Sequence, residues 1–231
     1  MSNDLIQRYQ AVLHRIQAAC EKAQRDPSCV SLLAVSKTKP VEDVSELAAH
    51  GQTQFGENYV QEALLKIEQH PELGWHFIGP IQSNKTKPIA ENFAWVHSVD
   101  RLKIAQRLSN QRPENLPPLN ILLEVNISNE ANKAGFTESE VVHVAKEIAE
   151  LPNLKLRGLM AIPIAETEHE KQRVPFSKMK QLLTTLQQAL PSCELDTLSM
   201  GMSGDLEAAI EEGATIVRIG TDIFGARNYA K

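Results

Sequence analysis

Two spacings of apolar residues alternate along the chain. Short, mostly apolar runs predict strands buried on both faces, and segments with apolar residues every three or four positions predict amphipathic helices. The predicted strands cover residues 32–36, 54–57, 74–79, 93–97, 119–125, 154–160, 195–200 and 215–219. The predicted helices that follow them cover residues 41–50, 59–69, 84–91, 101–108, 137–150, 175–190 and 205–212.

This order of elements predicts an α/β fold. Eight strands that alternate with helices form a parallel sheet, and their number favours a closed (β/α)8 TIM barrel over the alternative, a doubly wound open sheet. A further helix is predicted before the first strand, over residues 4–25, with Asn3 or Asp4 as its cap. Three prolines in residues 112–118 indicate a surface loop, so we expect one domain over residues 1–231.

Composition narrows the class of protein. Hydrophobic residues at 42% and a formal net charge of −5 are ordinary for a soluble globular protein and argue against a dedicated nucleic-acid binder. Cys20, Cys29 and Cys193 are widely spaced and form no CxxC motif, which favours reduced thiols. The amino-terminal residues lack the pattern of a secretory signal, and no apolar run is long enough to span a bilayer. We therefore expect a cytoplasmic protein.

Lys37 comes directly after the first predicted strand. Pro40 then begins a helix, so Lys37 lies at the carboxyl end of a barrel strand, where catalytic residues of such barrels are found. Partial desolvation there lowers the pKa of a lysine and supplies the free amine that a Schiff base with an aldehyde requires. This stretch by itself still favours the simpler interpretation, a lysine that reaches solvent and pairs with an acid.

Small residues follow the seventh and eighth predicted strands, in residues 199–206 and 219–221. Their hydroxyls and main-chain N–H groups suit an anion, and barrels often bind phosphate between these two loops. Either loop alone is better explained as a glycine-rich turn with Ser203 as a helix cap, but their combination favours phosphate. Arg218 lies inside an apolar strand and needs a partner, either an acid on a neighbouring strand or a ligand atom in the barrel mouth.

Several other chemistries lack support. The seven histidines show no metal-ligand spacing, and His76 and His97 fit the core as well as a site. The chain has no GxGxxG motif after a strand, no Walker loop and no GxSxG elbow. The methionines Met160, Met200 and Met202 fit soft packing better than catalysis, and would also form a wall beside a flat aromatic ligand. A lysine and a phosphate site together predict a ligand with an aldehyde and a phosphate, either pyridoxal 5′-phosphate or a sugar phosphate as in Schiff-base aldolases.

Six segments resemble the pyridoxal phosphate homeostasis protein family, in order and over nearly the whole chain. They are AVSKTKP at 34–40, FGENYVQE at 55–62, WHFIGPIQSNK at 75–85, GLMAIP at 158–163, SMGMSGD at 199–205 and VRIGT at 217–221. Asp222 departs from the family pattern, since a small residue is expected there. The departure follows the phosphate-binding positions and puts little in doubt.

The resemblance implies a fold and a binding site. The fold is the barrel of the alanine racemase N-terminal type, with pyridoxal phosphate held as a covalent aldimine on Lys37. Arg218 would face the pyridine nitrogen, Asn58 and Met200 would flank the ring, and Met160 belongs to the same site. The remaining implied ligands hold the phosphate and are Ser199, Ser203, Gly220 and Thr221. The family acts in vitamin B6 and amino-acid homeostasis without a defined catalytic reaction.

Physical chemistry supports a protein that is not an enzyme. A cation facing the ring nitrogen disfavours its protonation and makes the cofactor a poor electron sink. The chain ends shortly after the eighth strand, so we expect no second domain and a monomer. A racemase or lyase dependent on pyridoxal phosphate is the alternative. Apo-enzymes that accept the cofactor are candidate partners, with Lys39, Lys85 and Lys133 as amines on the barrel rim that could pass it on; no nucleic acid or membrane partner is expected.

Overall fold

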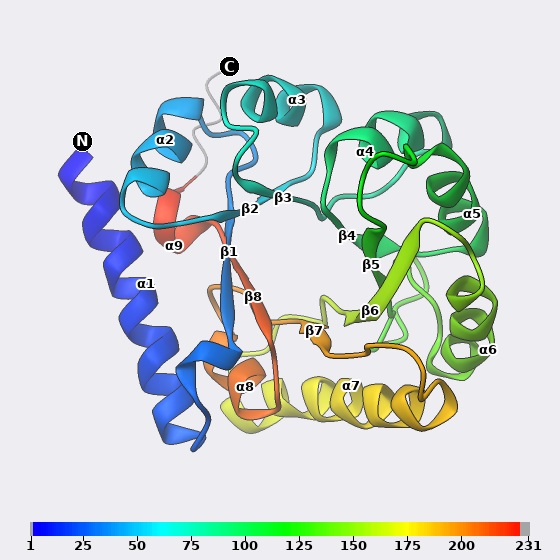
Figure 1. The fold of residues 1–231 in the computed structure, drawn as a ribbon. Helices are drawn as coiled ribbons and strands as arrows, with labels where there is room; N and C mark the ends of the chain where they lie inside the picture. Colours follow the sequence, from blue (N-terminus) through cyan, green and yellow to red (C-terminus); the bar gives the residue numbers. More distant parts are fainter. Residues whose placement is uncertain (1, 227–231) are drawn as a thin grey trace.

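The computed structural model describes residues 2–226, with side chains from residue 4 onwards. Eight parallel strands close into a barrel in sequence order, with helices around the outside (Figure 1). The strands are β1 Ser31–Val35, β2 Gln54–Glu57, β3 Gly74–Phe77, β4 Trp95–Val99, β5 Leu119–Glu124, β6 Leu154–Met160, β7 Thr197–Ser199 and β8 Ile216–Ile219. The barrel closes where Leu33 of β1 pairs with Arg218 of β8. The predicted (β/α)8 barrel is therefore confirmed, and the open sheet is excluded.

The helices follow the predicted order. They are α1 Ser2–Lys22, α2 Val41–Ala49, α3 Val60–Gln69, α4 Thr86–Asn92, α5 Leu102–Gln111, α6 Glu138–Ala149, α7 His169–Ala189, α8 Leu206–Glu211 and α9 Thr221–Phe224, with short 3-10 turns at Pro27–Cys29 and Ser83–Lys85. Most strand residues are apolar because side chains on both faces of the sheet are largely buried, inside the barrel or under the helices. Each fully buried Phe, Leu or Ile contributes about 1.5–3 kcal/mol through the hydrophobic effect.

Helix α1 lies outside the barrel, as predicted, and packs against α2, α8 and α9 (Figure 1). Its buried face carries Leu5, Tyr9, Val12 and Ile16, which recur at helical spacing. The helix begins at Ser2 and so already includes residues 3 and 4. The prediction that Asn3 or Asp4 caps this helix was therefore wrong, and the side chain of Asn3 lies outside the described residues.

Helix α7 begins earlier than the sequence indicates. It starts at His169 and contains Pro175, which we expected to mark its beginning. Proline removes one intrahelical hydrogen bond, so a helix interior is an unfavourable position for it. Contacts with the next helix stabilise the additional turns, because His169 contacts Glu211 at 2.8 Å and Arg173 donates to Glu212 at 2.7 Å. These partners are distant in sequence, and local patterns do not reveal them.

Three smaller differences lie near strand ends. Strand β4 begins two residues later than predicted because Phe93 caps the end of α4. The cap of α8 is Asp205, so the interpretation of Ser203 as a helix cap was wrong. Helix α9 was not predicted. Over residues 2–226, no helix has the length and apolarity that a membrane crossing requires.

Candidate functional site

A cavity of about 320 Å³ opens at the carboxyl ends of the strands. Residues from the ends of β1, β2, β3, β6, β7 and β8 surround it, which is the position of active sites in this architecture. Its lining consists of Val35, Lys37, Asn58, Ile78, Ile162, Met202, Ser203, Gly204, Arg218, Gly220 and Thr221. The fold thus gathers most of the predicted site residues around one cavity, although the first and last of them, Lys37 and Thr221, are 184 positions apart in the sequence.

The turn that carries Lys37 is strained and supported. Thr38 adopts a φ of 63°, a left-handed conformation that is unfavourable for a β-branched residue. Its N–H donates to a carboxylate oxygen of Glu62 at 2.6 Å, which compensates for part of that cost. The N–H of Lys39 donates to the carbonyl of Ser36 at 3.1 Å and closes the turn. Lys37 is therefore presented on a turn whose backbone has specific hydrogen-bond partners.

A buried ion pair lies beside this turn. Lys66 donates to the Oε1 atoms of Glu57 and Glu62 and to the carbonyl of Ser36, each at 2.7 Å. The Ser36 hydroxyl donates to the same Glu57 oxygen at 2.7 Å. Burial raises the pKa of Glu57, whereas the Lys66 ammonium opposes that shift. The pair fixes the backbone at the residue just before Lys37.

Two loops of small residues form another wall of the cavity. Ser203 and Gly204 come from the loop after β7, and Gly220 and Thr221 from the end of β8. Gly201 adopts a φ of 101°, and a Cβ atom there would lie 2.7 Å from the Cβ of Ala209, so only glycine fits where the first loop leaves its strand. The described lining residues provide two cations and several hydroxyl and N–H groups but no carboxylate. This chemistry suits a small anionic ligand.

Arg218 is 4% exposed, and hydrogen bonds inside the barrel hold its side chain in place. Its guanidinium donates to the Ser199 hydroxyl at 2.6 Å and to the Ala161 carbonyl at 3.0 Å. Burial lowers the pKa of Arg218 to about 10, so the group stays charged at neutral pH. A cation therefore lies on the floor of the cavity without a carboxylate bonded to it among the described residues.

Two histidines continue this chain of hydrogen bonds through the barrel. His97 Nδ1 lies 2.8 Å from the Ser199 hydroxyl, its Nε2 lies 2.8 Å from His76 Nδ1, and His76 Nε2 lies 2.7 Å from the Gln54 amide oxygen. Burial lowers the pKa of His76 to about 3 and that of His97 well below its usual value, so both rings are neutral. The Gln54 oxygen can only accept, so His76 carries its proton on Nε2 and accepts on Nδ1. His97 therefore donates from Nε2 to His76 and accepts on Nδ1 from the Ser199 hydroxyl. All the donors then point away from Arg218.

Three predicted site residues do not line the cavity. Ser199 is fully buried behind Arg218, and Met160 and Met200 are at most 1% exposed. Met202, which is 40% exposed, supplies the methionine in the cavity wall. The sequence analysis also missed Gly204, although it lies within the quoted SMGMSGD segment, and the apolar residues Val35, Ile78 and Ile162.

The three rim lysines differ in their surroundings. Lys39 donates to the carbonyls of residues 224, 225 and 226 at 3.2–3.3 Å, at the end of α9. Lys133 pairs with Glu130 at 2.6 Å, and Lys85 lines a neighbouring cavity of about 360 Å³ that shares Asn58 with the first. Their role in passing on a cofactor stays a prediction. No cluster of His, Cys, Asp and Glu suited to a metal ion occurs in the part of the chain that the structure describes.

Comparison with known proteins identifies the family. The model of the alanine racemase N-terminal domain matches residues 8–228. The chain belongs to this family. It is also similar to a pyridoxal phosphate homeostasis protein of Pseudomonas aeruginosa, with 59% identity over 220 residues and 94% of each chain covered.

Two solved structures share the family fold. One is an unknown protein from Bifidobacterium adolescentis, with a TM-score of 0.88, 32% identity and coverage of 96% of this chain and 95% of that chain. The other is PipY of Synechococcus elongatus with pyridoxal phosphate (PLP) bound, with a TM-score of 0.79, 36% identity and coverage of 92% and 100%. The resemblance to the PLP homeostasis proteins is therefore confirmed at the level of the whole chain.

Proposed function

We propose that this protein binds PLP in the cavity at the carboxyl ends of the strands and acts in the intracellular homeostasis of that cofactor. The observation that carries the proposal is that Lys37, Arg218 and the small-residue loops meet around one cavity, whose described lining includes no carboxylate. A relative at 59% identity is named a PLP homeostasis protein, and PipY has been solved with PLP. The cytoplasm is the proposed location, and a monomer with a single domain is the proposed form.

Lys37 is the proposed point of attachment. Its amine would condense with the aldehyde of PLP, forming a carbon–nitrogen double bond and releasing water. Ser203 with Gly204, and Gly220 with Thr221, would hold the phosphate through hydroxyl and main-chain N–H groups. Asn58 and Met202 would contact the ring, whereas Ser199, Met160 and Met200 would act from behind the cavity wall.

The charge and fixed position of Arg218 support a protein that binds PLP rather than one that uses it in catalysis. When bound, PLP can stabilise a carbanion, and it does so best with a protonated ring nitrogen. A guanidinium that faces this nitrogen would oppose its protonation, and Ser199 and Ala161 hold the Arg218 guanidinium in place. We therefore propose that the protein holds PLP without a defined reaction of its own. An amino-acid racemase is the second candidate, because the family includes the N-terminal domain of alanine racemase.

The test is chemical trapping. The purified protein should be yellow, and borohydride should reduce the link and leave a stable adduct on the peptide that contains Lys37, as measured by mass spectrometry. Lys37→Ala should be colourless and unlabelled, while Lys85→Ala, a lysine of the neighbouring cavity, should retain both signals. An unchanged adduct in Lys37→Ala would overturn the assignment.

The same preparation distinguishes the alternatives. A racemase would exchange the Cα hydrogen of an amino acid with deuterated water over many turnovers, and we expect no such turnover across the common amino acids. A Schiff-base aldolase would contain no chromophore as purified and would trap a sugar phosphate instead.

A further inference from the structure

Arg15 on helix α1 contacts both loops that line the phosphate side of the cavity. Its Nε and Nη2 atoms donate to the two carboxylate oxygens of Glu207 at 2.8 and 3.0 Å, and Nη1 donates to Asp222 at 2.6 Å. Nη2 also donates to the main-chain carbonyl of Ser203 at 3.0 Å. Glu207 lies in the first turn of α8 and Asp222 in the first turn of α9, so one guanidinium joins the segments that follow β7 and β8.

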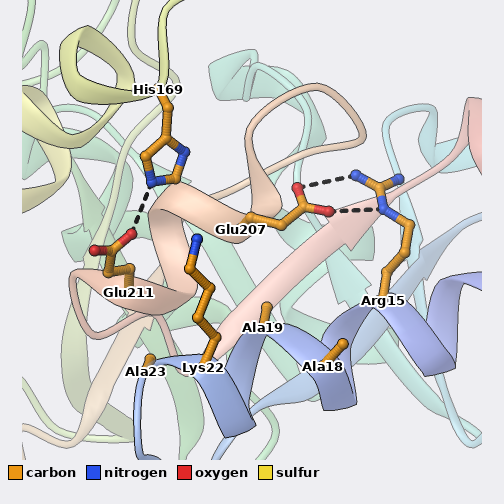
Figure 2. A pocket seen from close by; sticks show the side chains of 8 residues that line it. All are labelled: Arg15, Ala18, Ala19, Lys22, Ala23, His169, Glu207 and Glu211. Carbon is orange, nitrogen blue, oxygen red and sulfur yellow. Dashed lines mark hydrogen bonds and ion pairs between the residues drawn. The ribbon is translucent and has the colours of Figure 1, made fainter.

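The contact to Ser203 orients the neighbouring peptide. Arg15 and Glu207 line a separate groove of about 210 Å³ between α1 and α8, which shares no lining residue with the cavity (Figure 2). The carbonyl of Ser203 points to Arg15, and in a trans peptide the N–H of Gly204 points in the opposite direction. Gly204 lines the cavity. Arg15 thus fixes the orientation of this peptide beside the cavity.

The same guanidinium neutralises two carboxylates close to the proposed phosphate position. Glu207 is two residues after Asp205, the cap of α8, and Asp222 directly follows Thr221. At these positions their negative charges would repel a phosphate. Both carboxylates accept hydrogen bonds from Arg15, and neither Glu207 nor Asp222 lines the cavity. The bond to Glu207 raises the pKa of Arg15, so the guanidinium stays charged. Asp222, the one departure from the family pattern, is therefore an ion-pair partner of this arginine.

We infer that Arg15 is a positioning residue for the phosphate of the ligand, acting from outside the barrel through Ser203, Glu207 and Asp222. The inference rests on the proposed function for the identity of the ligand, because the phosphate is that of PLP. It assigns helix α1 a role in selecting phosphorylated over unphosphorylated pyridoxal.

The experiment compares ligands with and without the phosphate. Equilibrium affinities for PLP, pyridoxal and inorganic phosphate are measured for the wild-type protein, Arg15→Ala and Arg15→Lys. The matched control is Arg25→Ala, because Arg25 also joins the α1 region to α8 but donates to the carbonyl of Ile210 at 2.6 Å, away from the loops. Melting temperatures are measured in parallel.

Arg15→Ala should weaken PLP and inorganic phosphate binding by about tenfold, as expected for loss of a charge-assisted contact, and change pyridoxal affinity less than about twofold. Arg15→Lys keeps the charge but loses the fork geometry of the guanidinium. It should shift the ratio of the PLP and pyridoxal affinities in the same direction as Arg15→Ala, but by less. This variant keeps the inference testable if Arg15→Ala does not fold. Arg25→Ala should lower the melting temperature alone.

Two results would overturn the inference: an unchanged PLP-to-pyridoxal ratio in both Arg15 variants, or an equal shift of that ratio in Arg25→Ala. Failure of the proposed function is a distinct result, since the wild-type protein would then bind no PLP. The inorganic phosphate series would still test the role of Arg15 in that case.

Discussion

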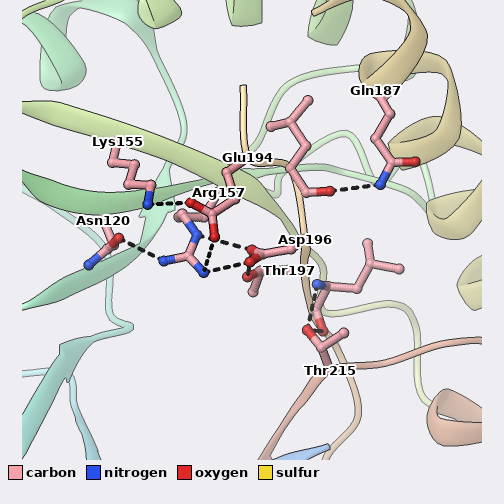
Figure 3. Close-up of polar contacts among 10 residues, drawn as sticks. Asn120, Lys155, Arg157, Gln187, Glu194, Asp196, Thr197 and Thr215 are labelled. Atoms are coloured by element: carbon pink, nitrogen blue, oxygen red, sulfur yellow. Dashed lines mark hydrogen bonds and ion pairs between the residues drawn. The ribbon is translucent and has the colours of Figure 1, made fainter. Parts of the chain in front are cut away.

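The two ends of the barrel use charged residues in opposite ways. At the amino ends of the strands, Arg157 pairs with both oxygens of Asp196 at 3.0 and 2.6 Å and donates to Asn120 at 3.1 Å (Figure 3). Its guanidinium also lies 4.8 Å from the ring centre of Trp95. Its charge is thus matched by partners on the same surface. At the carboxyl ends, Arg218 and the small-residue loops border a cavity whose described lining includes no carboxylate.

The pKa values of the carboxyl groups near the two ends of the barrel shift in opposite directions. Burial raises the pKa of Asp196, but hydrogen bonds from Arg157 and Thr197 outweigh it and lower that pKa overall. At the other end, burial dominates and raises the pKa values of Glu57 and Asp205, and raises that of Glu124 to about 7. The amino end is therefore organised for stability, and the carboxyl end retains desolvated polar groups at a cost, as expected of a binding site.

Replacement of Lys66 should have the largest effect on stability. Lys66→Met leaves the Glu57 carboxylate buried beside Ser36 without its cation, and loss of one partner of a buried pair costs about 3–5 kcal/mol. Urea unfolding at pH 7 measures the loss. The double variant Glu57→Gln/Lys66→Met should recover much of it, and a double variant no more stable than Lys66→Met would contradict this account.

The pH dependence at the carboxyl end should be of intermediate size. Burial and Asp100 raise the pKa of Glu124 to about 7 from its usual value of 4.5, against the opposing charge of Arg218. Between these two pKa values the unfolded chain loses a proton that the folded protein keeps. The contribution of Glu124 to the free energy of unfolding is therefore fully present below pH 4.5 and is lost as pH rises through 7. Allowing for partial exposure, the change is on the order of 2 kcal/mol.

Glu124→Gln should therefore flatten the stability profile across this interval, as measured by urea midpoints at pH 5 and pH 7.5. Equal slopes in the variant and the wild-type protein would mean that another group titrates. Asp196 contributes in the opposite sense, because its lowered pKa gives stability above the usual value of 3.8 that is lost as pH falls through the lowered one.

The ion pair at the amino end should have the smallest effect. Asp196 is 44% exposed, so Asp196→Ala should cost at most about 1 kcal/mol and leave PLP affinity unchanged. Thermal unfolding and a PLP titration on the same variant measure both quantities. A clear loss of PLP affinity would show that the two ends are coupled, with the His76–His97 chain between them as the structural link.

The sequence by itself determined the order of elements and much of the site. Apolar runs that end at Lys37 and at the small-residue loops mark the carboxyl ends of parallel strands, and those ends meet at one face of a barrel whatever the details of packing. Local signals also determine the start of α6, because Thr137 and Glu140 have the residue types and spacing of a capping box, and Glu140 accepts the N–H of Thr137 at 2.8 Å.

Only the tertiary structure decided which side chains reach the cavity and which support it from behind. Ser199 turns into the barrel towards His97, a residue 102 positions away, and Asp222 pairs with Arg15 across 207 positions. The extension of α7 before Pro175 likewise depends on partners in α8. Such contacts form when barrel closure and helix packing bring segments together that are far apart in sequence. The local spacing of residues does not indicate which distant segments will meet.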